Sequence, residues 1–251
     1  MKKTLTLSFL FFTILLFSQD VKKKKESVGG GKATFYVLKS DMTTKHGEYS
    51  VKAYSGNAIL ISGTYSNGKK VGKWTERYYR KGRNLKSTGN YKNDLQVGKW
   101  IYYNTQGEII QEYDFDKNEL ITSAECGNTT EYDVYLNGEL TKSTLDCPAS
   151  YIGGEQALIY ELLKKITRSF DFNTNEKGRT NIKFNNVVSF FIDKNGNLEN
   201  LQFQDEVEIP KLKEFIEKQI LEKKGKWIVG ELNGEKVKSK MELGLSINIM
   251  F

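Results

Sequence analysis

The pattern of apolar and polar residues changes near residue 150, and the two halves predict different secondary structure. Before that point, short aromatic-rich runs alternate with glycine-containing turns such as "SNGKKVG" and "NTQG", which is typical of β-hairpins. After it, apolar residues recur at helical spacing in "YIGGEQALIYELLKKI" and in "PKLKEFIEKQILEKK". Between these two predicted helices lies "VVSFFIDKNGNLENLQF", which predicts two strands around an Asn-Gly turn. The last strand alternates cleanly, and its apolar face holds Met241, Leu243, Leu245, Ile247 and Ile249.

These patterns predict a two-domain chain. The first domain is an all-β hairpin-repeat sheet. The second is α+β, with two helices on a three-stranded antiparallel sheet. The expected boundaries are a signal peptide over residues 1–19, a basic, glycine-rich flexible linker over 20–32, the β-repeat domain over 33–147 and the α+β domain over 148–251.

One short pattern is written twice, as "GTYSNGKKVGKW" from Gly63 and "GNYKNDLQVGKW" from Gly89, with landmarks 26 positions apart. A weaker earlier copy has Gly47 and Tyr49 in the places of the later Gly and Trp. Because a lone hairpin is barely stable, we expect large aromatic side chains to stack across neighbouring hairpins and bury a continuous stripe. The residues expected in this stripe are Trp74, Tyr78 or Tyr79, Trp100, Tyr102 and Tyr103.

These units resemble the MORN repeat and its bacterial variants over roughly residues 45–120. The resemblance implies a β-sheet scaffold with lipid- or protein-contacting surfaces. An alternative is that exposed Trp and Tyr rings bind glycan or single-stranded nucleic acid by stacking. Core packing is the expected role of these rings, and an exported protein is not expected to meet nucleic acid.

The second half resembles the C-terminal domain of TonB-type energy transducers, especially the form common in Bacteroidota, over about residues 149–251. The matching landmarks, in order, are a Gly153-Gly154 helix start with Ala157 and Leu158, a hairpin with Val188, Phe190, Ile192, Asp193 and Gly196, then Trp227, then Asn233-Gly234 with Val237, and a final strand. The chain departs from the family at Val229 and Lys236, where the family usually has proline.

In that family the domain accepts an extended peptide of an outer-membrane receptor as an added strand. A strand edge has unpaired backbone groups that a partner backbone can satisfy. Carried over, the resemblance implies a partner-binding strand edge formed by Met241, Leu243, Leu245, Ile247 and Ile249. The alternative is that the chain itself or a second copy caps this edge.

The N-terminus predicts export. Lys2-Lys3 precede a mostly apolar run from Leu5 to Phe17, which is typical of a cleaved signal peptide and shorter than the roughly 20 residues of a membrane span. The formal charge of +7 is concentrated partly in Lys22–Lys25. This stretch is expected to be a solvated arm; the alternative is a contact with anionic envelope polymers or lipids.

The only cysteines are Cys126 and Cys147, in the exported part of the chain. They flank two strand-like runs around Asn137-Gly138, so a hairpin there brings them nearly opposite each other. We expect a structural disulfide at its base, with two buried thiols as the alternative.

Candidate catalytic groups are sparse. His46 is the only histidine, which removes most His-based metal sites and Ser-His-Asp arrangements. "GGGKA" lacks the pattern of a phosphate loop, and "DKNGN" that of a calcium loop. We therefore expect no enzyme activity, no cofactor and no metal.

The sequence favours an exported cell-envelope adaptor of the periplasm or outer-membrane periphery, which binds a receptor peptide or a sister chain by strand addition. A first alternative is a structural scaffold whose repeats bind lipid or glycan. A second is a TonB-like transducer that keeps its N-terminal anchor and takes part in transmembrane transport.

Overall fold

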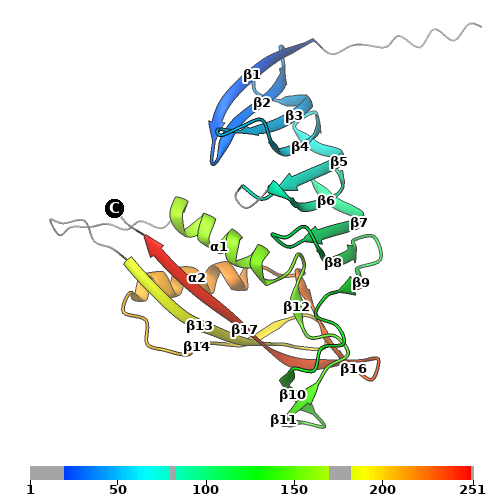
Figure 1. Ribbon diagram of the computed structural model, residues 1–251, viewed down its shortest axis with the longest axis vertical. Coiled ribbons are helices and arrows are strands. Elements are labelled where there is room, and N and C mark those ends of the chain that lie inside the picture. The colour runs from blue at the N-terminus through cyan, green and yellow to red at the C-terminus, as the bar shows by residue number, and fades with distance from the viewer. Residues whose placement is uncertain (1–19, 80–82, 170–181, 250–251) are drawn as a thin grey trace, which may run out of the picture.

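The computed structural model of the protein describes residues 20–79, 83–169 and 182–249. Within them the chain is mostly β-sheet with two helices (Figure 1). A large antiparallel sheet forms the N-terminal part, and a smaller α+β region follows it. The predicted signal peptide lies outside the described residues.

The first sheet has nine strands, and each pairs with its neighbours in the chain, so the order in the sheet is the order in the sequence. The strands are β1 (Val21–Val28), β2 (Gly31–Leu38), β3 (Lys45–Ala53), β4 (Ile59–Ser66), β5 (Lys69–Arg77), β6 (Leu85–Lys92), β7 (Leu95–Tyr103), β8 (Ile109–Asp114) and β9 (Glu119–Ser123).

The repeated glycines are explained by the tryptophans that lie over them. A Cβ atom at Gly63 would lie 2.1 Å from Cδ2 of Trp74, and one at Gly89 would lie 2.3 Å from Cδ2 of Trp100. Each indole can lie against the neighbouring strand only because that position has no side chain. Tyr49 pairs with Gly63 as Trp74 pairs with Gly89, so the weak first copy occupies the same place in its hairpin.

Aromatic rings form a continuous row across this sheet. The ring centroids are 5.8 Å apart between Tyr49 and Trp74, 5.9 Å between Trp74 and Tyr91, and 5.1 Å between Tyr91 and Trp100. These separations fall in the range in which aromatic pairs add to the gain from burial. The predicted stripe is therefore present.

Part of its expected membership is wrong. Tyr79 is 41% exposed, because it lies beyond the end of β5. Tyr103 is next to Tyr102 in β7, and consecutive residues of a strand face opposite sides of the sheet. Tyr78 donates its hydroxyl hydrogen bond to the backbone oxygen of Tyr103 at 2.7 Å.

The prediction of a flexible linker over residues 20–32 is also wrong. The lysine-rich stretch forms β1, which pairs with β2 from Val21 opposite Leu38 to Val28 opposite Gly31. Lysine side chains do not prevent backbone pairing, and an edge strand can leave them in solvent.

The second sheet has the strand order β11-β10-β17-β13-β14, and β16 also pairs with β17. A separate short pair joins β12 to β15. The bounds of these elements are β10 (Glu131–Leu136), β11 (Glu139–Thr144), β12 (Ser150–Tyr151), β13 (Ile182–Ile192), β14 (Leu198–Phe203), β15 (Trp227–Ile228), β16 (Gly230–Leu232) and β17 (Glu235–Ile249).

This sheet is larger than the three strands predicted, and the domain boundary near residue 147 does not hold for it. The hairpin β10–β11, assigned from the sequence to the repeat domain, pairs with β17 through Val134 opposite Ser239 and Tyr135 opposite Lys238. A strand in the middle of a sheet has two pairing edges, and β10 satisfies part of the second one.

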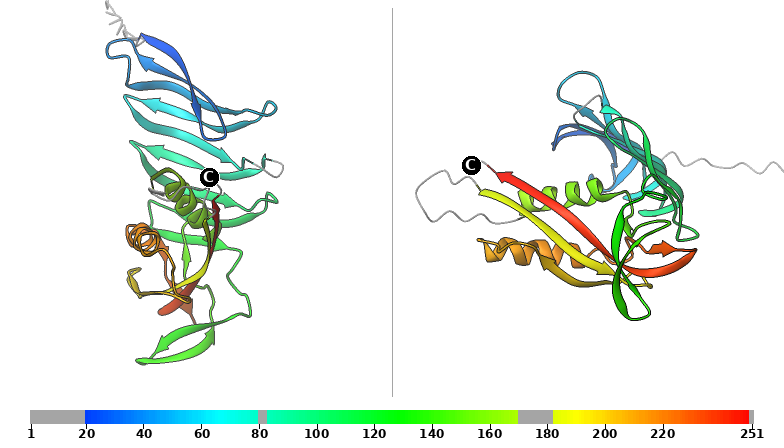
Figure 2. Two further views of the ribbon diagram at one scale, coloured as in Figure 1. Left: turned by 90° about the vertical axis from the view of Figure 1, so that its left-hand side faces the viewer. Right: turned by 60° about the horizontal axis from the view of Figure 1, so that its bottom comes forward.

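Helices α1 (Glu155–Ser169) and α2 (Pro210–Leu221) cover one face of this sheet, α1 nearer β17 and α2 nearer β13 and β14 (Figure 2). Both helices were predicted, and Glu155 lies in the first turn of α1 and Pro210 at the start of α2. Their apolar sides form one core with the sheet, in which Leu158, Ile216 and Leu243 are fully buried.

The two parts of the molecule pack against each other through β7 and β8. Ile152 and Ile228 are buried in the same cluster as Trp100 and Tyr113. Gln111, only 2% exposed, accepts a hydrogen bond from the backbone N–H of Gly153 at 2.6 Å. The junction is therefore an apolar contact that contains one buried hydrogen bond, from the backbone of Gly153 to the side chain of Gln111.

Candidate functional site

Strand β17 has one edge that is paired over most of its length and one that is paired only near its start. Along the first, β13 pairs with it from Ser239 to Ile249. Along the second, β10 pairs with Lys238 and Ser239. The short strand β16 pairs with Glu235–Val237 at the start of β17, in a hairpin with it. From Lys240 onward, no strand in the described residues pairs with this second edge. We call the stretch from Lys240 to Ile249 the open edge.

One backbone donor on the open edge is satisfied by a side chain. The N–H of Gly244 donates a hydrogen bond to the carboxylate of Glu155, in the first turn of α1. Since alternate residues of a strand direct their backbone groups to the same side, Glu242 and Ser246 face the open edge together with Gly244. Burial raises the pKa of Glu155, the nearby Glu125 carboxylate raises it further, and the Gly244 hydrogen bond opposes both.

The side chains named from the sequence lie on the core face of β17. Met241, Leu243, Leu245 and Ile247 are at most 8% exposed and pack under the helices. Ile249 pairs its backbone with Ile182, and its side chain lies outside the described part of the structure. These side chains hold the strand in place, and the groups that could meet a partner are backbone N–H and C=O groups.

Where β10 separates from β17, the strands bound a cleft of about 290 Å³. Its walls include β10, the segment Pro148–Tyr151, Glu155 and the start of the open edge at Lys240. A strand added along the open edge would therefore have one end at this cleft.

The charges around the cleft are arranged in pairs. Lys142 lies 2.7 Å from Asp133, and its hydrogen bond lowers the pKa of that carboxyl group. Lys240 lies 2.8 Å from Glu242 and 3.5 Å from Asp133, and the Glu242 contact raises the pKa of the ammonium group. The charged side chains at the entrance of the cleft are therefore already paired with one another.

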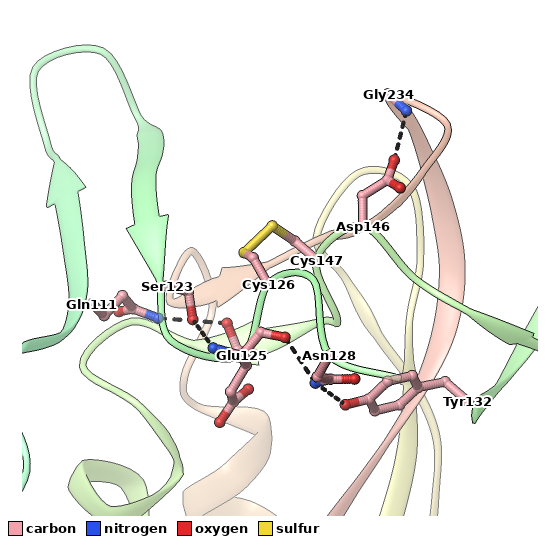
Figure 3. Close-up of a disulfide and its surroundings, with 10 residues drawn as sticks. Gln111, Ser123, Glu125, Cys126, Asn128, Tyr132, Asp146, Cys147 and Gly234 are labelled. Atoms are coloured by element: carbon pink, nitrogen blue, oxygen red, sulfur yellow. Dashed lines mark hydrogen bonds between the residues drawn. A yellow bond between two sulfur atoms is a disulfide. The ribbon is translucent and has the colours of Figure 1, made fainter. Parts of the chain in front are cut away.

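The predicted disulfide between Cys126 and Cys147 is present at the base of the β10–β11 hairpin (Figure 3). Next to it, the carboxylate of Asp146 accepts a hydrogen bond from the N–H of Gly234 at 2.9 Å. The backbone of Cys147 also pairs with Glu231 of β16. The hairpin is therefore fixed beside β17, and disulfides of this kind persist in oxidising environments.

Sequence reasoning located the strand but missed two features that delimit its edge, the pairing of β10 and the Glu155 contact. Neither has a local signal, because both join residues that are far apart in the chain.

Comparison of this chain with protein-family models, curated proteins and solved structures gives no match. The resemblances to the MORN and TonB families therefore stay predictions. None of the helices in the described part of the chain is long and apolar enough to span a bilayer.

Proposed function

We propose that the protein is an exported cell-envelope adaptor that binds an extended segment of another polypeptide by adding it as a strand to the open edge of β17. The partner is a peptide of an outer-membrane receptor or a second copy of this chain. In this proposal the first sheet is a MORN-like scaffold and the C-terminal region is a TonB C-terminal-like domain. Its role is binding and not catalysis.

The observation that carries the proposal is the unequal pairing of β17. One edge is paired to β13 from Ser239 to Ile249, while the other has no strand partner in the described residues beyond Ser239. Unpaired strand edges are templates for β-augmentation, in which main-chain hydrogen bonds give the affinity. The core under Leu243 and Leu245 keeps the template rigid.

A test should block the edge without disturbing the core. Ser246 is exposed, and its N–H faces the open edge, so Ser246→Pro removes one donor and places a ring there while the pairing with β13 can persist. Ser246→Ala is the matched control, because it loses only the hydroxyl group.

A photocrosslinking residue at position 244 of the full chain would then report the partner in envelopes of the source cell. We expect crosslinks to one extended segment of another polypeptide, retained in Ser246→Ala and strongly reduced in Ser246→Pro. A synthetic peptide of that segment should slow hydrogen exchange at Glu242 and Ser246. Equal crosslinking by the proline and alanine variants would refute strand addition.

A further inference from the structure

Two lysines lie flat on the aromatic row of the first sheet. The Lys45 ammonium is 4.8 Å from the ring centroid of Phe35, 5.3 Å from that of Tyr49 and 5.5 Å from that of Tyr65. Lys70 Nζ is 4.4 Å from the ring centroid of Trp74 and 4.7 Å from that of Tyr91. Ammonium groups at these distances are attracted to ring faces, so both charges are held at fixed places on the sheet.

The repeat sets these positions. Lys45 and Lys70 come four residues before Tyr49 and Trp74, and Gln96 holds the same place before Trp100. In that third unit Lys226 of the C-terminal region donates a hydrogen bond to the Gln96 side chain at 3.1 Å, and its ammonium is 4.9 Å from the Phe115 ring centroid. The C-terminal region thus occupies the third unit, while the first two keep lysines of their own.

The positive charge of Lys45 and Lys70 is not neutralised by a contact. Neither forms an ion pair with another residue in the described part of the chain. Burial lowers the pKa of Lys70; Glu76 and Asp94 raise it, and Lys164 of α1 and Lys45 lower it further. Neither carboxylate contacts the Lys70 ammonium: Glu76 lies 3.9 Å from Lys86, and Asp94 accepts a hydrogen bond from the backbone N–H of Lys70 at 2.8 Å.

Three of the rings that the two ammonium groups contact carry a hydroxyl group. Tyr49, Tyr65 and Tyr91 are half-buried, and among the described residues their hydroxyls have no hydrogen-bond partner. Burial raises the pKa of Tyr65 and of Tyr91 to about 12, so both phenols stay neutral donors at physiological pH. Further along the row, Trp100 and Tyr102 are buried at the junction with the C-terminal region, and Tyr102 is hydrogen-bonded to Gln96.

The backbone here offers nothing to a peptide, because β3, β4, β5 and β6 each have a paired strand on both sides. A flat bilayer is also a poor fit. Helix α1 stands beside this face (Figure 2), and the ring centroid of its Tyr160 is 4.3 Å from the Lys86 ammonium of β6, so the helix obstructs the approach of a flat surface. A flexible polymer that carries negative charges, hydroxyls and apolar ring faces can contact the ammonium groups, the phenol hydroxyls and the aromatic rings of this face together.

We propose that this face, defined by Lys45, Lys70, Tyr49, Tyr65 and Tyr91, binds an acidic polysaccharide. Lys45 begins β3 and Lys70 lies at the start of β5, two strand spacings away, so the site suits negative groups about 10 Å apart. This function is separate from strand addition and uses another part of the molecule.

The test is calorimetric titration of the full chain with oligogalacturonate, and with its methyl ester as the uncharged form of the same polymer. We expect binding of the acid and none of the ester. The variant Lys45→Gln/Lys70→Gln should bind about tenfold more weakly or worse, because hydrogen bonds to charged groups are lost. The control Lys52→Gln/Lys73→Gln loses the same charge from exposed lysines on the opposite face of the sheet and should bind as the unmodified chain does.

Three outcomes would overturn the proposal. Equal weakening in both double variants would mean general attraction to a basic protein. Poly-L-glutamate binding as tightly as oligogalacturonate would assign the face to acidic polypeptides. Binding to phosphatidylglycerol vesicles, without binding to oligogalacturonate, would assign it to a membrane surface. Ser246→Pro should leave oligogalacturonate binding unchanged, which separates this result from the test of strand addition.

Discussion

The first sheet and the C-terminal region are both built on antiparallel strands, yet they obtain their cores differently. In the first sheet every strand pairs with its neighbours in the chain, and aromatic rings on one face supply the packing. In the C-terminal region β17 pairs with β10 and β13, which are distant in sequence, and two helices close the core. Local pairing spreads stability over nearest-neighbour contacts, whereas non-local pairing concentrates it in one cooperative unit.

The largest expected effect tests the local side of this comparison. Gly63→Val would place a side chain where the Trp74 indole lies and should lower the free energy of unfolding by about 4 kcal/mol, from overpacking and lost indole burial. Urea denaturation measures the loss. Gly244→Ala is the matched control, because nothing lies within 4 Å of its added Cβ atom, and it should change stability little.

Truncation in the cooperative core should cost somewhat less but spread further. Leu243→Ala removes a fully buried side chain and should cost about 3 kcal/mol. Hydrogen exchange should accelerate in β13, β17 and both helices while β2 to β5 keep their protection. Uniform acceleration through all strands would show that the two regions unfold as one unit.

The hydrogen bond between Gln111 and Gly153 joins the two regions, and its loss should have a smaller effect on stability. Gln111→Ala leaves the buried N–H of Gly153 without its acceptor and should cost about 2 kcal/mol. Calorimetry should then show two transitions further apart than in the unmodified chain. Gln106→Ala, an exposed residue in the turn before β8, is the control and should leave both transitions in place.

The smallest effect concerns pH. Because burial raises the pKa of Glu155, the folded chain binds this proton more tightly than the unfolded chain. The resulting stabilisation is complete below the unfolded value of 4.5 and is lost as the pH rises through the raised pKa. Denaturation at a series of pH values should show this fall in the unmodified chain and not in Glu155→Gln. The exposed Glu235→Gln is the control and should retain the fall.

Much of the fold could be predicted because its signals are local. The Gly-Trp spacing, the helical periodicity after residue 154 and the alternation before Ile249 each act within a short stretch of chain. The failures are non-local. β1 carries no alternating apolar pattern, since pairing with β2 and not burial makes it a strand, and β10 joins β17 across about one hundred residues.

In the candidate site, too, the features with a local sequence signal were predictable and the non-local ones were not. The final strand was predictable from its alternation, and the disulfide from the hairpin between its cysteines. The extent of the open edge and the contact of Glu155 with Gly244 depend on how elements far apart in the sequence pack together. The local pattern of apolar and polar residues does not predict that packing.

The lysines of β1 have a consequence for neighbouring molecules. The nine-stranded sheet ends at β1, and the outer edge of β1 has unpaired backbone groups. Without the lysines, copies of the chain could pair there and join end to end. Lys22–Lys25 place ammonium groups on both faces of the sheet beside that edge, so a second copy approaching with its own β1 would be repelled. The same residues that hid this strand in the sequence therefore oppose its pairing with the β1 strand of a second copy.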